Sequence, residues 1–259
     1  RKVAGVRTEE QVVAANVDSV WIVSSLDQDF SLRRIERYLT LAWESGANPV
    51  IVLTKSDLSD DADRCSREVE SISTGTRVHT TSILTRDGLS ELHTYLSNHA
   101  TVALLGSSGV GKSTLINALA GSALQETAEV RGDGKGRHTT THRQLLRLPS
   151  GGLIIDTPGM RELQLWESQT GLADTFADID EFASDCRFSD CRHAGEPGCA
   201  VAVAVARGQL PEDRLQSYQK LQRELAHLER KQDARAQSRE TQRMKSIMKS
   251  LRHHPKYKK

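Results

Sequence analysis

The sequence predicts an α/β fold, in which a parallel sheet has helices on its faces, followed by a smaller and mainly helical C-terminal domain. Two observations predict it. Continuous apolar runs, each ending in a loop rich in Gly, Ser, Thr or Asp, suit strands that are buried on both faces of a parallel sheet. Between them lie helical repeats of apolar residues, and strands that alternate with helices are typical of doubly wound domains.

Four apolar runs and three helical repeats give the order of the elements. The runs predict strands within Val20–Val23, Pro49–Asp57, Thr101–Gly106 and Gly152–Gly159, and the repeats predict helices over Leu32–Trp43, Leu89–Leu96 and Leu115–Ala120. Beyond residue 178 a loop rich in Cys, Gly and Asp precedes a long amphipathic pattern that starts at Asp213. We therefore expect one domain over residues 12–178, a second over 179–229 and a basic helix or tail over 230–259.

The composition is that of an ordinary globular protein. The 259 residues carry a net charge of +1, and 37% of them are hydrophobic, which is enough to build a core. No apolar run approaches about 18 residues and no signal peptide precedes the fold, so we expect a cytoplasmic protein without membrane contact. The chain begins at Arg1 rather than Met, and we expect that an N-terminal piece is missing.

The near-zero net charge hides an asymmetry along the chain. Residues 230–259 contain eleven Lys or Arg and two acids, so the remainder of the chain is net acidic. A basic tail on an acidic body favours a polyanionic partner. The alternative is a solvated tail that binds nothing.

A phosphate-binding loop follows the predicted strand at 101–106. The pattern G-x4-G-K-[ST] lies between a predicted strand and a predicted helix, and its glycines let backbone N–H groups surround a β-phosphate. In this loop we expect Lys112 to bridge the β- and γ-phosphates and Ser113 to bind Mg²⁺. The expected site for a nucleoside triphosphate comprises Gly106, Ser107, Ser108, Gly109, Val110, Gly111, Lys112, Ser113 and Thr114.

Two acidic motifs end other predicted strands. Asp156 stands where a P-loop protein needs an acid to orient Mg²⁺, and the Gly159 N–H is expected to meet the γ-phosphate. Asp57 ends another run, and its carboxylate is able to accept two hydrogen bonds from guanine, a donor pair that adenine lacks. The alternative for Asp57 is an ordinary helix cap.

The expected guanine site has two segments. The Lys55 stem lies along the base face, and a backbone group near Ser82 contacts the guanine O6. Thr54 stands where the usual signature has Asn, which leaves the tethering of the loop and the guanine affinity open. The expected residues are Thr54, Lys55, Ser56, Asp57 and Ser82.

The order of these motifs is unusual. A conventional GTPase runs from the phosphate loop to D-x-x-G and then to the guanine loop. In this chain the segments 54–57 and 80–82 precede 106–113 and 156–159. The sequence therefore predicts a P-loop GTPase fold with a circularly permuted motif order.

A cluster of metal-ligand residues follows the last motif. Cys186, Cys191, His193 and Cys199 lie within 14 residues. Three thiolates and one imidazole make a closed, tetrahedral site for one structural Zn²⁺, with no position left for catalysis. The alternative is a set of free thiols, since disulfides are disfavoured in the cytosol.

A permuted GTPase followed by such a loop resembles the ribosome small-subunit-dependent GTPase A family, RsgA, also called YjeQ or YloQ. The resemblance runs from Val12 to Tyr218 and includes Gly136–Thr141 and Asp156–Arg161. The family's N-terminal oligonucleotide-binding barrel is essentially absent, with residues 1–11 as its possible remnant. The resemblance implies hydrolysis of GTP to GDP, stimulated by the small (30S) ribosomal subunit and its 16S rRNA, by a monomer that acts late in subunit maturation.

The residue that orients the attacking water is not the usual one. Met160 follows D-x-x-G, and its thioether does not orient water. The Gly-rich segment before it is typical of a switch loop, and His138 in that segment is the candidate for positioning the water, as the resemblance supports. One of Thr139 and Thr140 is expected to complete the Mg²⁺ coordination. The alternative is that His138 is a surface imidazole.

Two other classes of function are compared with a GTPase that acts as a molecular switch. A guanine-nucleotide-regulated module that binds RNA or protein, with little turnover of its own, fits the same motifs. Turnover measured with and without small subunits separates the two. A P-loop kinase is disfavoured, because Asp57 selects guanine and the sequence offers no acceptor-substrate site.

Overall fold

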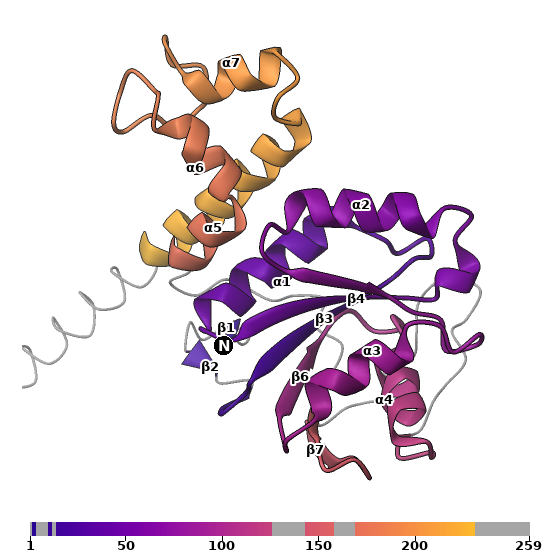
Figure 1. The fold of residues 1–259 in the computed structure, drawn as a ribbon. Coiled ribbons are helices and arrows are strands. Elements are labelled where there is room, and N and C mark those ends of the chain that lie inside the picture. Colours follow the sequence, from indigo (N-terminus) through magenta and orange to yellow (C-terminus); the bar gives the residue numbers. More distant parts are fainter. Residues whose placement is uncertain (1, 4–9, 12–13, 126–142, 158–168, 231–259) are drawn as a thin grey trace, which may run out of the picture.

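The computed structural model describes residues 2–3, 10–11, 14–125, 143–157 and 169–230 (Figure 1). Its centre is a six-stranded sheet with the order β5-β4-β3-β6-β8-β7, and a separate antiparallel pair joins β1 to β2. The strands are β1 (Lys2–Val3), β2 (Glu10–Gln11), β3 (Ser19–Ser25), β4 (Asn48–Thr54), β5 (Arg77–Thr80), β6 (Thr101–Leu105), β7 (Gln144–Arg147) and β8 (Leu153–Asp156).

The four predicted strands are confirmed as β3, β4, β6 and β8, which pair in parallel. Every residue of β3 is buried, because helices cover both faces of the sheet. The sequence analysis missed the two edge strands, β5 beside β4 and the antiparallel β7 beside β8. Leu146 is the only buried residue of β7, so this strand has no continuous run of buried apolar residues from which it could have been predicted.

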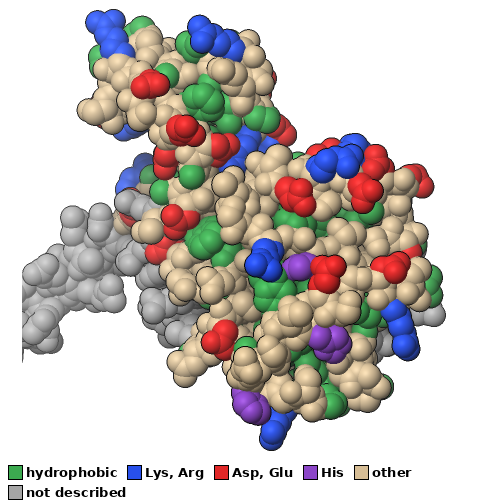
Figure 2. Space-filling model, in the orientation of Figure 1, with side chains coloured by type: hydrophobic (Ala, Val, Ile, Leu, Met, Phe, Trp, Pro, Cys, Tyr) green, Lys and Arg blue, Asp and Glu red, His purple; other side chains and the backbone are tan. Residues whose placement is uncertain are grey.

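Helices cover the sheet on both faces, and the three predicted ones are confirmed. One hydrophobic cluster joins the sheet to α1 (Leu32–Glu44) and α2 (Ala62–Ile72). A second joins it to α3 (Leu89–His93), the 3₁₀ turn η2 (Thr94–Leu96) and α4 (Lys112–Ala120). The unpredicted α2 buries only Val69 and Ile72, and Figure 2 shows acidic and basic side chains interspersed over it.

The strand order places the loops that carry the motifs at one edge of the sheet. The chain runs from β3 outward through β4 and β5, then restarts at β6 on the other side of β3 and continues to β8. In open α/β sheets, ligands bind outside the carboxyl ends of the strands where the order reverses in this way. The loops after β4, β3 and β6 therefore meet at the expected ligand site.

The C-terminal part is helical, as predicted, and packs beside α1 (Figure 1). It contains α5 (Gln169–Thr175), α6 (Ala177–Ala183), α7 (Ala200–Ala206) and a helix described from 212 to 230. Among the described residues, no helix is both long and apolar enough to cross a membrane. The apolar positions of the long helix are buried as its spacing predicts: Leu215, Tyr218, Leu221, Leu225 and Leu228.

Buried charges join α1 to this helical part. Glu36 on α1 is completely buried and accepts hydrogen bonds from Arg214 at 3.0 Å and from Ser217 at 2.5 Å. Arg33, one turn earlier on α1, donates to the same carboxylate at 2.8 Å. Arg214 also donates to Asp178 at 2.6 and 2.7 Å. The two parts of the chain thus share a buried network of charges as well as an apolar cluster.

Candidate nucleotide-binding site and metal centre

The predicted phosphate-binding loop connects β6 to α4. A Cβ on Gly106 would lie 2.4 Å from the Val23 carbonyl oxygen, so the loop passes β3 at a distance that only glycine allows. Gly109 and Gly111 have φ values of +87° and +95°, in the left-handed region that glycine tolerates best. The loop leads directly into the N-terminus of α4, where free N–H groups and the helix dipole favour a phosphate.

Lys112, the first residue of α4, is buried inside this loop. Its Nζ donates to the carbonyl oxygens of Gly106 at 2.9 Å and Ser107 at 2.8 Å. Burial lowers the pKa of Lys112 to about 8, although the nearby charge of Asp156 acts to raise it. The ammonium is thus held by two carbonyls within reach of the phosphate position.

The residues beside Lys112 fit a magnesium ion bound with a triphosphate. Asp156 is completely buried at the carboxyl end of β8, the strand next to β6. Its charge reaches Lys112, and Ser113 adds a half-buried hydroxyl in the first turn of α4. Carboxylate and hydroxyl oxygens are the hard ligands that Mg²⁺ prefers, usually together with waters and substrate phosphates.

Thr54 supplies the tether that the sequence left open. Its side chain is completely buried, and its hydroxyl donates to the Val110 carbonyl of the phosphate-binding loop at 2.6 Å. A hydroxyl therefore joins the end of β4 to the phosphate-binding loop. The role expected of the usual Asn at this position does not require an amide.

The two predicted guanine segments are in contact with each other. Asp57 lies in the short 3₁₀ helix η1 (Ser56–Leu58) and accepts a 2.5 Å hydrogen bond from the Ser82 hydroxyl. The Ser56 N–H donates to the Thr81 carbonyl at 3.2 Å. Segments 54–57 and 80–82, separated in the sequence, are thus hydrogen-bonded to each other after β4 and β5.

A cavity of about 640 Å³ lies between the loops that follow β3, β4 and β6. Lys55 borders it with a left-handed φ of +59°, and its Nζ donates to the Gly109 carbonyl at 2.9 Å and to Asp27 Oδ2 at 2.7 Å. The sequence analysis did not identify Asp27. Its position just beyond β3, at the carboxyl edge of the sheet, is the signal that could have found it.

Several predicted site residues lie outside the described residues. These are His138, Thr139, Thr140 and Gly159, together with Met160 and the basic segment beyond Arg230. Of the predicted Mg²⁺ ligands, the structure therefore describes Ser113 and Asp156. Thr114, the last residue of the predicted phosphate site, is exposed on α4.

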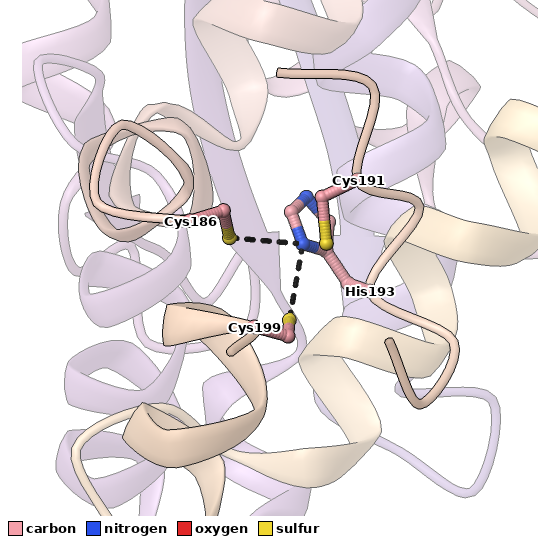
Figure 3. Close-up of side chains that lie close together, drawn as sticks. All are labelled: Cys186, Cys191, His193 and Cys199. Carbon is pink, nitrogen blue, oxygen red and sulfur yellow. Dashed lines mark hydrogen bonds between the residues drawn. The ribbon is translucent and has the colours of Figure 1, made fainter. Parts of the chain in front are cut away.

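The four predicted metal ligands converge in the helical C-terminal part (Figure 3). Their ligand atoms all lie within 4.8 Å of one another, and His193 Nδ1 is 3.7 Å from Cys186 Sγ and 3.4 Å from Cys199 Sγ. Tetrahedral Zn²⁺ with ordinary bond lengths needs S···N separations of about 3.6 Å. Cys186, Cys191, His193 and Cys199 therefore fit a closed metal site.

Backbone groups of α7 face two of the sulfurs. The N–H of Ala200 donates to Cys186 Sγ and that of Ala202 to Cys199 Sγ, both at 3.3 Å. Burial acts to raise the pKa of Cys186, but hydrogen bonds from the backbone of Val201 and Ala200 outweigh it and hold that pKa below its ordinary value, which favours the metal-binding thiolate. The start of α7 thus holds two of the ligand sulfurs in place.

The turn that carries His193 is held by Glu196, which the sequence analysis missed. The Glu196 carboxylate accepts from the backbone N–H of Arg192 at 3.2 Å and of Ala194 at 2.7 Å, on either side of the histidine. It also lies 3.8 Å from Cys191 Sγ. Partners of this kind orient the ligands of a metal site.

A P-loop site, a guanine segment placed before it in the chain and a mostly parallel sheet with helices on both faces define a GTPase with a circularly permuted motif order. The RsgA GTPase family model matches residues 1–166, and the chain belongs to this family. A second model, described as 50S ribosome-binding GTPase, matches residues 101–236, a range that begins at β6. The predictions of the family, of the permuted fold and of a GTP-hydrolysing enzyme are confirmed.

Curated relatives and solved structures agree with this assignment. The chain is 49% identical over 250 residues to the small ribosomal subunit biogenesis GTPase RsgA 1 of Listeria innocua, covering 96% of this chain and 72% of that protein. It is 50% identical over 249 residues to the protein of the same name in Oceanobacillus iheyensis, covering 95% and 71%. YjeQ from Thermotoga maritima is 35% identical, with a TM-score of 0.59 over 82% of this chain and 72% of that one. YloQ, described as a circularly permuted GTPase, is 30% identical, with a TM-score of 0.57 over 82% and 69%.

Proposed function

We propose that this chain hydrolyses GTP as a biogenesis factor of the small ribosomal subunit, acting late in maturation and stimulated by that subunit. The observation that carries the proposal is its identity of 49% and 50%, over nearly its whole length, to two relatives named for that role. The proposed partners include the 16S rRNA, and the proposed state is a cytoplasmic monomer. Residues 230–259, with eleven basic side chains, suit contacts with rRNA phosphates.

The described contacts support the proposed binding of a guanine nucleotide. Asp57 accepts from the guanine edge while Ser82 holds its carboxylate, and the Lys55 stem covers the base. Lys112 donates to the β- and γ-phosphates in place of the carbonyls of its own loop. Ser113 and Asp156 would hold Mg²⁺, which neutralises charge on the phosphate oxygens when it is bound.

We assign the positioning of the attacking water to His138, with Thr139 or Thr140 completing the Mg²⁺ coordination. The His138→Ala variant is expected to bind GTP within about twofold of the parent chain, because the residue contacts water and not the nucleotide. Its turnover in the presence of purified small subunits is expected to fall about a hundredfold. Steady-state phosphate release and GTP titration measure the two quantities.

The control for this experiment is His93→Ala, which removes an exposed imidazole on α3. It is expected to keep full turnover. If the parent chain gains no turnover from small subunits, the proposed ribosomal role fails and a regulated binding module is favoured. If the gain is present and His138→Ala keeps it, only the assignment of the water-positioning residue fails.

We propose that the metal is one structural Zn²⁺ per chain. The set of three thiolates and one imidazole supports zinc over harder cations such as Mg²⁺. Elemental analysis of protein purified without chelator is expected to find about one zinc per chain. The Cys191→Ala variant is expected to lose it and to destabilise the helical C-terminal part while GTP binding persists. Cys65→Ala, which changes a cysteine on α2, is the control, and zinc loss in that variant would contradict the assignment.

A further inference from the structure

We propose that Asp27 is a positioning residue for guanine-nucleotide binding, because its carboxylate holds the Lys55 ammonium and with it the guanine loop. Asp27 belongs to neither the phosphate-binding motif nor the guanine motif. It follows β3, the strand that separates β4 from β6 in the sheet. Its Oδ2 lies 2.7 Å from Lys55 Nζ, and the Gly109 carbonyl accepts a second hydrogen bond from the same ammonium at 2.9 Å. One cation thus joins the loops after three neighbouring strands.

Asp27 is fixed before any nucleotide binds. Its Oδ1 accepts a hydrogen bond from the Ser25 hydroxyl at 2.8 Å and another from the Asp29 N–H at 2.9 Å. Partial burial acts to raise the pKa of Asp27, but the hydrogen bonds from Lys55, Asp29 and Ser25 outweigh it and hold the pKa below its ordinary value. The carboxylate is therefore charged at neutral pH, and one of its oxygens is aimed at Lys55.

Lys55 needs such a partner. Its φ of +59° lies in the left-handed region, which costs a non-glycine residue about 1 kcal/mol or more unless its surroundings hold it there. It immediately precedes the 3₁₀ turn that contains Asp57. A Lys55 side chain that is released from Asp27 keeps only the neutral Gly109 carbonyl as a partner, and is held less firmly over the base face and beside this turn. The pair is about three-quarters buried, with 23% of the Lys55 and 26% of the Asp27 side chain exposed, so water replaces the bond poorly.

The first test is a double-mutant cycle on nucleotide affinity. Calorimetric titration with GDP, which carries the same base and undergoes no turnover, is applied to Asp27→Ala, Lys55→Met and the double variant. Methionine keeps most of the apolar stem over the base and removes the ammonium. Loss of a charge-assisted hydrogen bond is expected to weaken GDP binding about tenfold in each single variant. The double variant is expected to match Lys55→Met within about twofold, because Asp27 acts through Lys55.

Two further variants separate positioning from folding. Asp27→Asn keeps the oxygen that accepts from Ser25 and Asp29 but turns an NH2 donor toward the Lys55 ammonium, so it is expected to lose about as much GDP affinity as Asp27→Ala while the Asx turn to Asp29 stays intact. Asp29→Ala removes an acid two residues away that pairs with Arg34 at the surface, and it is expected to leave GDP affinity unchanged. The proposal is overturned if the losses in the double variant add, or if Asp27→Ala binds GDP as the parent does. These titrations contain no ribosomes, so their outcome is independent of the proposed ribosomal role.

Discussion

Replacing Lys112 with Met is expected to weaken GTP binding about a hundredfold or more, and to lower turnover at least as far. The ammonium is buried at the N-terminus of α4, where water poorly replaces its charge-assisted hydrogen bonds to phosphate oxygens. Methionine has a similar length and no charge, so the loop keeps its packing while the phosphate loses its cation. Titration with a non-hydrolysable GTP analogue and single-turnover hydrolysis measure the two effects.

The pH dependence of binding gives a second measurement of the same residue. The pKa of Lys112 is lowered to about 8 in the structure, and a bound triphosphate raises it by placing negative charge beside the ammonium. Below that pKa both forms of the protein are protonated and the affinity does not change with pH. Above it the free protein must take up a proton to bind, so the dissociation constant rises up to about tenfold per pH unit.

The Lys112→Met variant serves as the control for this slope. It lacks the lysine to which the slope is assigned, so its dissociation constant is expected to stay level between pH 7 and 9, from about one unit below to one unit above the pKa of that lysine. Equal slopes in the variant and the parent chain would show that another group controls the pH dependence. A parent chain with a level profile would contradict the burial of a titrating Lys112.

The sequence predicts those parts of the site whose functional residues lie close together in the chain. The G-x4-G-K-[ST] pattern specifies a turn that few other residues can make, and Gly106 confirms it through its close approach to Val23. The cluster of Cys and His residues likewise lies within one short segment, so its ligands can meet without knowledge of the rest of the fold. The apolar stripe from Leu215 to Leu228 predicts a buried helix face for the same reason.

The parts that the sequence did not predict depend on contacts between distant segments. Asp27 gains its role from Lys55, which lies 28 residues away, and no motif links the two. From the sequence alone, Glu36 would be taken for a surface acid of an amphipathic helix. Only the fold shows that Arg214, 178 residues later, donates a hydrogen bond to its carboxylate. The edge strand β7 forms because β8 offers a free edge, and its own four residues, of which one is buried, are too few to predict a strand.

The junction between α1 and the helical C-terminal part leads to the second large effect. Replacing Arg214 with Met is expected to lower the free energy of unfolding by about 3 kcal/mol, because it removes one partner of the completely buried Glu36. The loss lies at the lower end of the range for broken buried pairs, since Arg33 and Ser217 still face that carboxylate. It also leaves the Thr175 carbonyl without the hydrogen bond that Arg214 donates to it. The expected fall in melting temperature is about 6–12 °C.

Asp213→Ala is the matched control, because it removes a neighbouring acid that pairs with Arg33 at the surface, where 68% of the Asp213 side chain is exposed. An exposed pair contributes about 0–1 kcal/mol, so this variant is expected to melt within about 2 °C of the parent chain. Thermal unfolding followed by circular dichroism compares the two. Equal melting temperatures for Arg214→Met and Asp213→Ala would show that the apolar cluster alone holds α1 to the C-terminal helices. A large loss confined to Arg214→Met would show that this buried charge network stabilises the junction between α1 and the C-terminal helices.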